Sequence, residues 1–221
     1  GLSFEEAKCQ FMDVIGSEAS RFRFLLDSQN LAPEDKEQYQ AIIAMKSGAY
    51  WMSEPVLSRS LKTLSELLNK HYRKKTLVFI DEYDVPIAKA SSNGYYKEML
   101  EVMKAMLSAA LKDNSALKFA VITGCLKIAK ESIFTGTNNF VSDTIATTRF
   151  NEYFGFTDSE VDQLYEKYTR NTREIHISRE DLKEWYDGYT TKSGERMYNP
   201  RFVVLALTNN NIGNYWTSSG P

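Results

Sequence analysis

Two short apolar segments, separated by a stretch with helical periodicity, constrain the fold of this chain most strongly. Leu77–Ile80 and Leu117–Ile122 are almost entirely apolar, as buried strands are. Between them, apolar residues recur at helical spacing from Tyr95 to Leu111. A strand, a helix and a second strand within about fifty residues form a βαβ unit, in which the strands run parallel. We therefore predict a parallel α/β sheet with helices covering both of its faces.

Helix start signals predict further helices on both sides of this unit. The polar run Ser91–Gly94 is typical of a loop and separates the first strand from the helix that follows. The predicted helices cover residues Ser3 to about Val14, Ser53 to His71, Thr157 to Tyr168, Ser178 to Trp185 and Pro200 to Leu207.

Composition excludes several classes of protein. The chain has 221 residues, enough for one sizeable domain or a domain with an appendage. Its net charge of −2 provides no overall attraction to nucleic acid or to an anionic membrane. No apolar run approaches the roughly 20 residues that cross a bilayer. Cys9 and Cys125 match no metal-binding spacing, so we expect reduced thiols in a cytoplasmic protein.

Acidic residues follow the first apolar segment directly, at Asp81, Glu82 and Asp84. Ligands of open α/β sheets bind beyond the carboxyl ends of the strands, and Thr123 ends the next segment. An apolar strand followed by Asp-Glu has the form of a Walker B segment, in which Asp holds Mg²⁺ and Glu polarises the attacking water. A polar residue at the end of the neighbouring strand can then sense the γ-phosphate. We expect Asp81 and Thr123 to face one cleft, and Asp84 to point towards the loop or a helix N-terminus.

The same carboxylates have two alternative interpretations. They could merely cap the turn that begins near Val85-Pro86, or form the metal cluster of a nuclease. The nuclease interpretation requires an E-x-K motif on a following strand, which the sequence does not supply. The chain also contains no G-x-x-x-x-G-K-[ST] phosphate loop. We therefore expect the isolated chain to bind no ATP at millimolar nucleotide and to hydrolyse none.

A series of motifs resembles the bacterial AAA-ATPase-like proteins in sequence and in order. The match runs from about Leu77 to Gly220. Those proteins pair an AAA-like or STAND-like P-loop ATPase core with a C-terminal domain that resembles PD-(D/E)XK nucleases. The resemblance implies a Walker A segment before Ser3 and the nuclease-like domain after Pro221, so the chain resembles an internal fragment. The motifs are "LVFIDEYDVPIAKA", "GYYKEML", "LKFAVITGCLKIAKESIFTGTNNF", "RFNEYFGFTDSEV", "LKEWYDGY", "MYNPRFVV" and "YWTSSG".

The resemblance also implies roles for individual residues. Asp81 matches the metal-binding Asp of the Walker B pair, Glu82 its catalytic Glu, and Thr123 the sensor, so these three would contact Mg²⁺ and ATP in the intact protein. Lys127 stands where family members often carry Arg, which retains the positive charge but loses the bidentate fork. Arg149 is the remaining candidate for a sensor or trans-acting arginine. A salt bridge to a neighbouring carboxylate is its alternative role.

The predicted fold class is α/β, an incomplete P-loop-NTPase-like parallel sheet flanked by helices. Residues 1–150 form this core without its P-loop segment, and residues 151–221 form a small helical lid region. Because the missing N-terminal strands would extend the sheet, it should be short and have an exposed edge. We expect the Walker B and sensor half of a Mg²⁺-dependent ATPase. The alternative is a non-catalytic interaction module on an ATPase-derived scaffold. The sequence leaves the oligomeric state and the physiological partner open.

Overall fold

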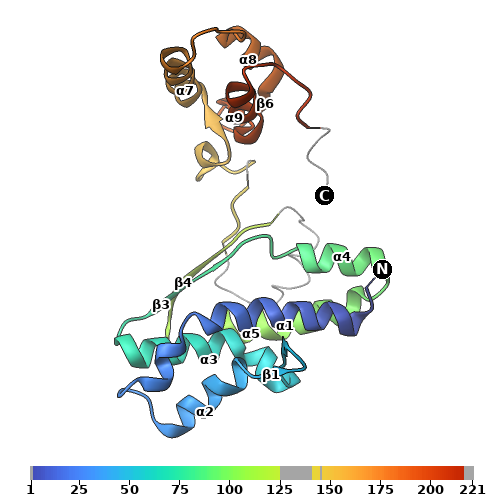
Figure 1. The fold of residues 1–221 in the computed structure, drawn as a ribbon, viewed down its shortest axis with the longest axis vertical. Coiled ribbons are helices and arrows are strands. Elements are labelled where there is room, and N and C mark those ends of the chain that lie inside the picture. The colour runs from blue at the N-terminus through green and yellow to red at the C-terminus, as the bar shows by residue number, and fades with distance from the viewer. Residues whose placement is uncertain (1, 125–140, 145, 217–221) are drawn as a thin grey trace. The chain divides into compact units, whose positions relative to one another are not determined.

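The computed structural model describes residues 2–124, 141–144 and 146–216. The chain divides into two compact units, Gly1–Phe140 and Val141–Pro221 (Figure 1). Each unit has its own hydrophobic core. Among the described residues, no helix is both long and apolar enough to span a bilayer.

The first unit is a layer of helices packed against a parallel pair of strands. Helices α1, α3 and α5 lie side by side, and β3 and β4 run next to them (Figure 1). The elements of this unit are α1 (Phe4–Ser20), η1 (Arg23–Asp27), α2 (Pro33–Ile42), β1 (Met45–Lys46), β2 (Ala49–Tyr50), α3 (Glu54–Tyr72), β3 (Thr76–Ile80), α4 (Val85–Asn93), α5 (Tyr96–Leu111) and β4 (Leu117–Ile122).

Strands β3 and β4 form the predicted βαβ unit with α5. They pair in parallel, with Leu77 opposite Phe119 and Ile80 opposite Ile122. Ile80 and Ile122 pack against the methionine-rich core that α5 buries. The prediction of parallel strands connected by this helix is therefore confirmed.

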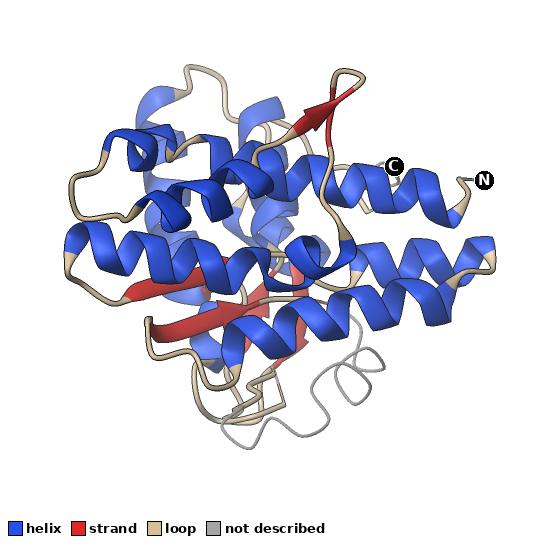
Figure 2. Ribbon diagram, turned by 90° about the horizontal axis from the view of Figure 1, so that it is seen from below, coloured by secondary structure: helices blue, strands red, loops and turns tan. Residues whose placement is uncertain are grey.

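The prediction that helices cover both faces of this sheet is wrong for the described structure. Side chains alternate along β3 and β4, and those that face α3 and α5 are half-buried. Helices make up most of the described residues, as the view from below shows (Figure 2). The opposite face is exposed, and Phe79 there keeps 68% of its surface. This open apolar face consists of Leu77, Phe79, Phe119 and Val121.

A helix replaces the loop predicted after the acidic residues. Helix α4 includes the polar run that the sequence suggested was a loop, and ends at Gly94, whose φ is 84°. Its last polar side chains bond back to the helix: Ser92 Oγ donates to the Ala88 carbonyl at 3.3 Å, and Asn93 Nδ2 to the Lys89 carbonyl at 2.8 Å. These bonds allow Ser and Asn in a final helical turn, although both residues favour loops.

Helix α1 begins as predicted but is longer than predicted. Ser3 caps it in a reciprocal bond pair with Glu6, and the helix continues past Val14 to Ser20. The short hairpin β1–β2 packs on its second half, where the ring of Tyr50 lies against Gly16. A Cβ at position 16 would lie 2.3 Å from that ring, so glycine permits the close approach.

The second unit combines the predicted helices with a small sheet that the sequence did not predict. Strand β7 lies between β5 and β6 and pairs antiparallel with both. Strand β6 begins at Asp187-Gly188, although this pair of residue types is typical of turns. The elements are η2 (Asn151–Tyr153), β5 (Phe156–Thr157), α7 (Asp158–Asn171), α8 (Arg179–Tyr186), β6 (Asp187–Thr190), β7 (Arg196–Tyr198) and α9 (Pro200–Asn209).

A guanidinium group joins three elements of the second unit. Arg179 begins α8, and its side chain is 18% exposed. Its Nε donates to Asp162 Oδ1 at 2.7 Å, and its Nη2 to Asp158 Oδ1 at 2.8 Å. The Tyr198 hydroxyl, on β7, accepts from Nη1 at 3.2 Å and donates to Asp158 Oδ1 at 2.6 Å. The hydrogen bond from Tyr198, reinforced by Arg179, lowers the pKa of Asp158, although burial opposes the shift.

Candidate functional site

The backbone holds the ends of β3 and β4 together beyond the sheet. The Thr123 N–H donates to the Ile80 carbonyl at 2.9 Å, and the Tyr83 N–H donates to the Thr123 carbonyl at 3.1 Å. Two backbone hydrogen bonds thus connect Thr123 to the end of β3 and to the turn that follows it. Because of these bonds, the acidic turn after β3 and Thr123 after β4 meet at the same edge of the sheet.

Asp81 and Thr123 are in direct contact. The Thr123 hydroxyl donates a hydrogen bond to Asp81 Oδ1, and the Glu82 N–H donates to the same oxygen at 3.0 Å. Both Asp81 and Thr123 are exposed. The described residues provide no hydrogen bond to the second oxygen, Oδ2. Two donors therefore fix the carboxylate in one orientation and leave one oxygen available to a ligand.

Glu82 adopts a left-handed backbone conformation, with a φ of 51°. This region is sparsely populated by residues other than glycine. The Glu82 carbonyl accepts from the Val85 N–H at 3.0 Å, which closes a tight turn before α4. The side chain of Glu82 is exposed, beside that of Asp81 in the chain. Sequence patterns did not reveal this conformation, because nothing in the Asp-Glu-Tyr-Asp run requires it.

Asp84 takes a different place from Asp81. It is the N-cap residue of α4, where its carbonyl accepts from the Ala88 N–H at 2.8 Å, and it is only 5% exposed. A Cβ added at Gly124 would lie 2.5 Å from both Asp84 Oδ1 and the Tyr83 ring. The missing side chain at position 124 therefore allows the end of β4 to pack closely on the acidic turn. The sequence contained this Thr-Gly pair, but only Thr123 was identified as a candidate.

The two predicted basic residues, Lys127 and Arg149, lie outside the part of the first unit that the structure describes. Lys127 lies outside the described residues. Arg149 belongs to the second unit, where its Nε donates to Asp143 Oδ2 at 3.0 Å and a second bond joins the same carboxylate. The hydrogen bonds from Arg149 to Asp143 raise the pKa of the guanidinium. In the structure Arg149 therefore forms a salt bridge with a neighbouring carboxylate, which is the alternative role that the sequence suggested for it.

The donor atoms at this edge fit a hard cation. Asp81 and Glu82 supply carboxylate oxygens and Thr123 a hydroxyl, and Mg²⁺ prefers oxygen ligands of this kind. Within the described ranges, no group of three or more His, Cys, Asp or Glu side chains is placed to hold a metal by itself. Mg²⁺ in nucleotide sites usually takes only one or two carboxylates, and water and phosphates complete its shell. The pair at Asp81 and Glu82 is compatible with such a site.

The comparisons with known proteins point to one family. An uncharacterised protein from the vnfD 5′ region of Azotobacter chroococcum mcd 1 is 28% identical over 148 residues. The aligned part is 66% of this chain but only 27% of that protein, so the chain spans about a quarter of its relative. No solved structure matches the chain significantly. The family described as "Predicted AAA-ATPase" matches residues 6–134, more than half of the chain, and the chain therefore belongs to that family.

Proposed function

We propose that this chain carries the Walker B and sensor half of a Mg²⁺-dependent ATPase, and that the intact protein hydrolyses ATP. One observation supports the proposal most directly. The Thr123 hydroxyl bonds to Asp81 Oδ1 at the carboxyl ends of two paired parallel strands. Asp81, Glu82 and Thr123 thus lie at the edge where α/β sheets bind their ligands. Membership of a predicted ATPase family is consistent with this function.

Each of the three residues has a distinct role in the proposed reaction. Asp81 would hold the metal, and its Oδ2 is the oxygen that the bonds from Thr123 and the Glu82 N–H leave unoccupied. Glu82, exposed on its left-handed turn, accepts a proton from the attacking water. Thr123 fixes the Asp81 carboxylate and faces the γ-phosphate. When bound, ATP would supply the phosphoryl group, and Mg²⁺ would offset the negative charge on its oxygens.

The phosphate-binding part of the site is proposed to come from other parts of the intact protein. A Walker A loop holds phosphates with several charge-assisted bonds, each worth about 1.5–3 kcal/mol. Losing four or five of them removes most of the roughly 8 kcal/mol of a micromolar complex. The carboxylates of Asp81 and Glu82 attract the metal but repel bare phosphates. Lys127 and Arg149 are the candidates in this chain for additional phosphate contacts.

The test begins with this chain and continues with the full-length protein. Isothermal titration of the chain with Mg²⁺-ATP should give no binding isotherm. In the full-length protein, Glu82→Gln should preserve nucleotide binding and lower turnover about a hundredfold, the scale of a lost general base. Glu37→Gln, an exposed acid on α2, is the matched control and should leave turnover unchanged.

Two results would contradict the proposal. A micromolar isotherm for the isolated chain would show that other residues hold the phosphates. Unchanged turnover of Glu82→Gln in an active full-length protein would remove Glu82 as the base. A full-length protein that neither binds nor hydrolyses ATP would instead favour the non-catalytic interaction module.

A further inference from the structure

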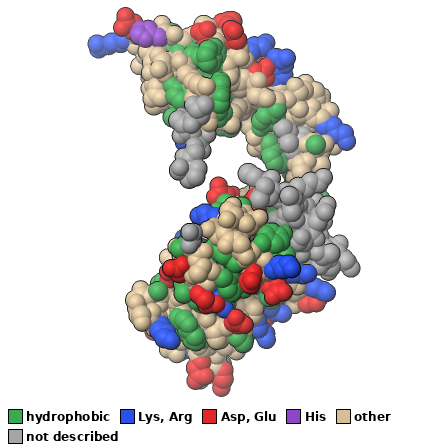
Figure 3. Space-filling view, turned by 90° about the vertical axis from the view of Figure 1, so that its right-hand side faces the viewer, with side chains coloured by type: hydrophobic (Ala, Val, Ile, Leu, Met, Phe, Trp, Pro, Cys, Tyr) green, Lys and Arg blue, Asp and Glu red, His purple; other side chains and the backbone are tan. Residues whose placement is uncertain are grey.

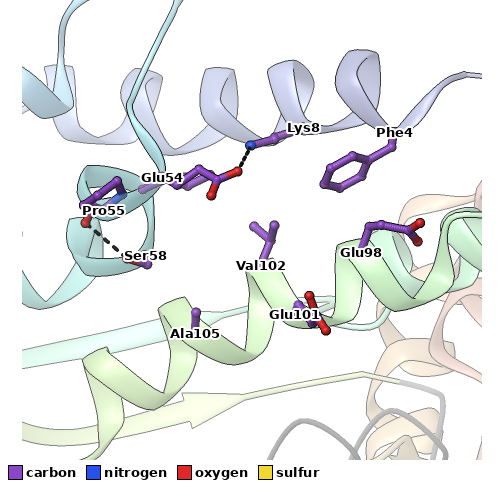
Figure 4. A pocket seen from close by; sticks show the side chains of 10 residues that line it. Phe4, Lys8, Glu54, Pro55, Ser58, Glu98, Glu101, Val102 and Ala105 are labelled. Atoms are coloured by element: carbon purple, nitrogen blue, oxygen red, sulfur yellow. Dashed lines mark hydrogen bonds and ion pairs between the residues drawn. The ribbon is translucent and has the colours of Figure 1, made fainter.

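A groove lies between three helices of the first unit, away from the edge that carries Asp81 and Thr123. Its volume is about 620 Å³, in the range typical of binding pockets. Helices α1, α3 and α5 supply its walls, and Phe4 of α1 and Val102 of α5 point into it from opposite sides (Figure 4). None of its lining residues belongs to the candidate ATPase site. Any ligand of this groove therefore adds to the function proposed above.

The interior of the groove is largely apolar. The apolar lining residues come from all three helices: Phe4, Pro55, Leu57, Val102 and Ala105. Lys8 is the basic residue of the lining, and its side chain is only 11% exposed. The Lys8 ammonium bonds to Glu54 Oε1 at 2.7 Å and lies 5.7 Å from the centre of the Phe4 ring. Because Glu54 already neutralises Lys8, the groove offers no free positive charge to an anionic ligand.

Two further carboxylates leave the rim with an excess of negative charge. Glu98 and Glu101 project from α5 beside the groove, three residues apart, and both are exposed (Figure 4). In the part of the chain that the structure describes, neither forms an ion pair. Acidic, basic and apolar side chains all lie on the visible surface of this unit (Figure 3). An apolar groove whose lining carries three carboxylates and one lysine favours a ligand that is both apolar and cationic.

We propose that this groove is a docking site for a basic amphipathic helix of a partner protein. Apolar side chains of the helix occupy the space over Val102 and Ala105, as in other helix-in-groove complexes. Lysines or arginines one turn apart on the helix pair with Glu98 and Glu101, whose spacing is also about one turn. Charge complementarity selects this ligand over an acidic helix, which the rim repels.

The test uses the whole 221-residue chain and two synthetic helical peptides. The probe is the leucine–lysine peptide LKKLLKLLKKLLKL, and its counterpart carries glutamate in place of every lysine. Fluorescence anisotropy of the labelled peptides measures affinity. The lysine peptide should bind, and the glutamate peptide should not. The double variant Glu98→Gln with Glu101→Gln should weaken binding about fivefold to tenfold, the scale of two exposed charge pairs.

Two variants separate this groove from the rest of the acidic surface. Ala105→Trp fills the groove from an exposed position on α5 and should weaken lysine-peptide binding at least tenfold. The double variant Glu34→Gln with Glu37→Gln removes two exposed carboxylates at the same spacing on α2 and should bind like the wild type. Circular dichroism checks that each variant is folded. Absence of binding, or equal weakening by both glutamine pairs, would overturn the proposal.

Discussion

Replacing Arg179 by Met tests whether its guanidinium holds the second unit together. Met keeps an apolar stem but loses two ion pairs to half-exposed carboxylates, each worth about 0.2–1 kcal/mol. It also loses the hydrogen bond to the Tyr198 hydroxyl, about 1 kcal/mol, and the cation–π contact with that ring, about 0.5–1 kcal/mol. We therefore expect the free energy of unfolding of the Arg179→Met variant to be lower than that of the wild type by about 2–3 kcal/mol. The loss stays below that of a fully buried pair because water reaches Asp158 and Asp162.

Thermal unfolding followed by tryptophan fluorescence measures this loss. Trp185 and Trp216 belong to the second unit, so a Trp51→Phe background confines the signal to that unit. A unit of this size loses about 4–8 °C of Tm per kcal/mol, so Arg179→Met should lower Tm by about 10–20 °C.

The control for this prediction is Arg170→Met. Arg170 also forms an ion pair, with Glu166, but its side chain is 75% exposed. Its replacement should change Tm by only a few degrees at most, as expected of surface pairs. Equal Tm values for the Arg179 and Arg170 variants would refute the reasoning, because they would show that the partly buried Arg179 network contributes no more than a surface pair.

Three further predictions concern the pH dependence of the second unit and two packing sites of the first. The pKa of Asp158 is lowered in the folded state. The stability that its carboxylate contributes is therefore fully present above the ordinary pKa of 3.8, and it is lost as the pH falls through the lower pKa of the folded state. The stability difference between the wild type and Asp158→Asn, measured by urea unfolding, should therefore be largest near neutral pH and shrink in acid; a constant difference would contradict this. Gly124→Ala places a Cβ against Tyr83 and Asp84 and should lower the free energy of unfolding by about 1–3 kcal/mol. Gly94→Asn is its control, because Asn tolerates the left-handed backbone there and no atom lies within 4 Å of the new Cβ. Finally, Glu54→Gln should destabilise the first unit, since it leaves the nearly buried Lys8 ammonium without a carboxylate, whereas Lys8→Met should be nearly neutral. Chemical denaturation measures the stability of both variants. A similar loss of stability in Glu54→Gln and Lys8→Met would contradict the prediction.

The parallel strands and the helix between them were predictable because their patterns are long and unambiguous. Leu77–Ile80 and Leu117–Ile122 are almost entirely apolar, as sheet strands often are, and α5 repeats its methionines at helical spacing. Helix α4 was missed because its polar end resembles a loop, and side-chain bonds to its own backbone compensate for that composition. The strands of the second unit were missed because they are only two to four residues long, too short for an alternating pattern to emerge.

Part of the candidate site also followed from the sequence. The meeting of Asp81 and Thr123 was predictable, because parallel strands end at the same edge of a sheet. The left-handed backbone of Glu82 was not, since residue type alone rarely identifies that conformation outside glycine. The steric need for Gly124 depends on where the Tyr83 ring packs, which is a tertiary contact. Local patterns thus predict which residues meet, and tertiary packing decides how closely they approach.

The open face of the β3–β4 pair also determines how this chain behaves in concentrated solution. Leu77, Phe79, Phe119 and Val121 present adjacent apolar side chains to water, and within the described residues each strand has one unpaired edge. Surfaces of this kind promote self-association and strand addition. Light scattering from the purified chain should therefore rise with protein concentration. Ammonium sulfate should increase that scattering, because excluded salts strengthen apolar burial, so dilute, low-sulfate buffers suit work on this chain.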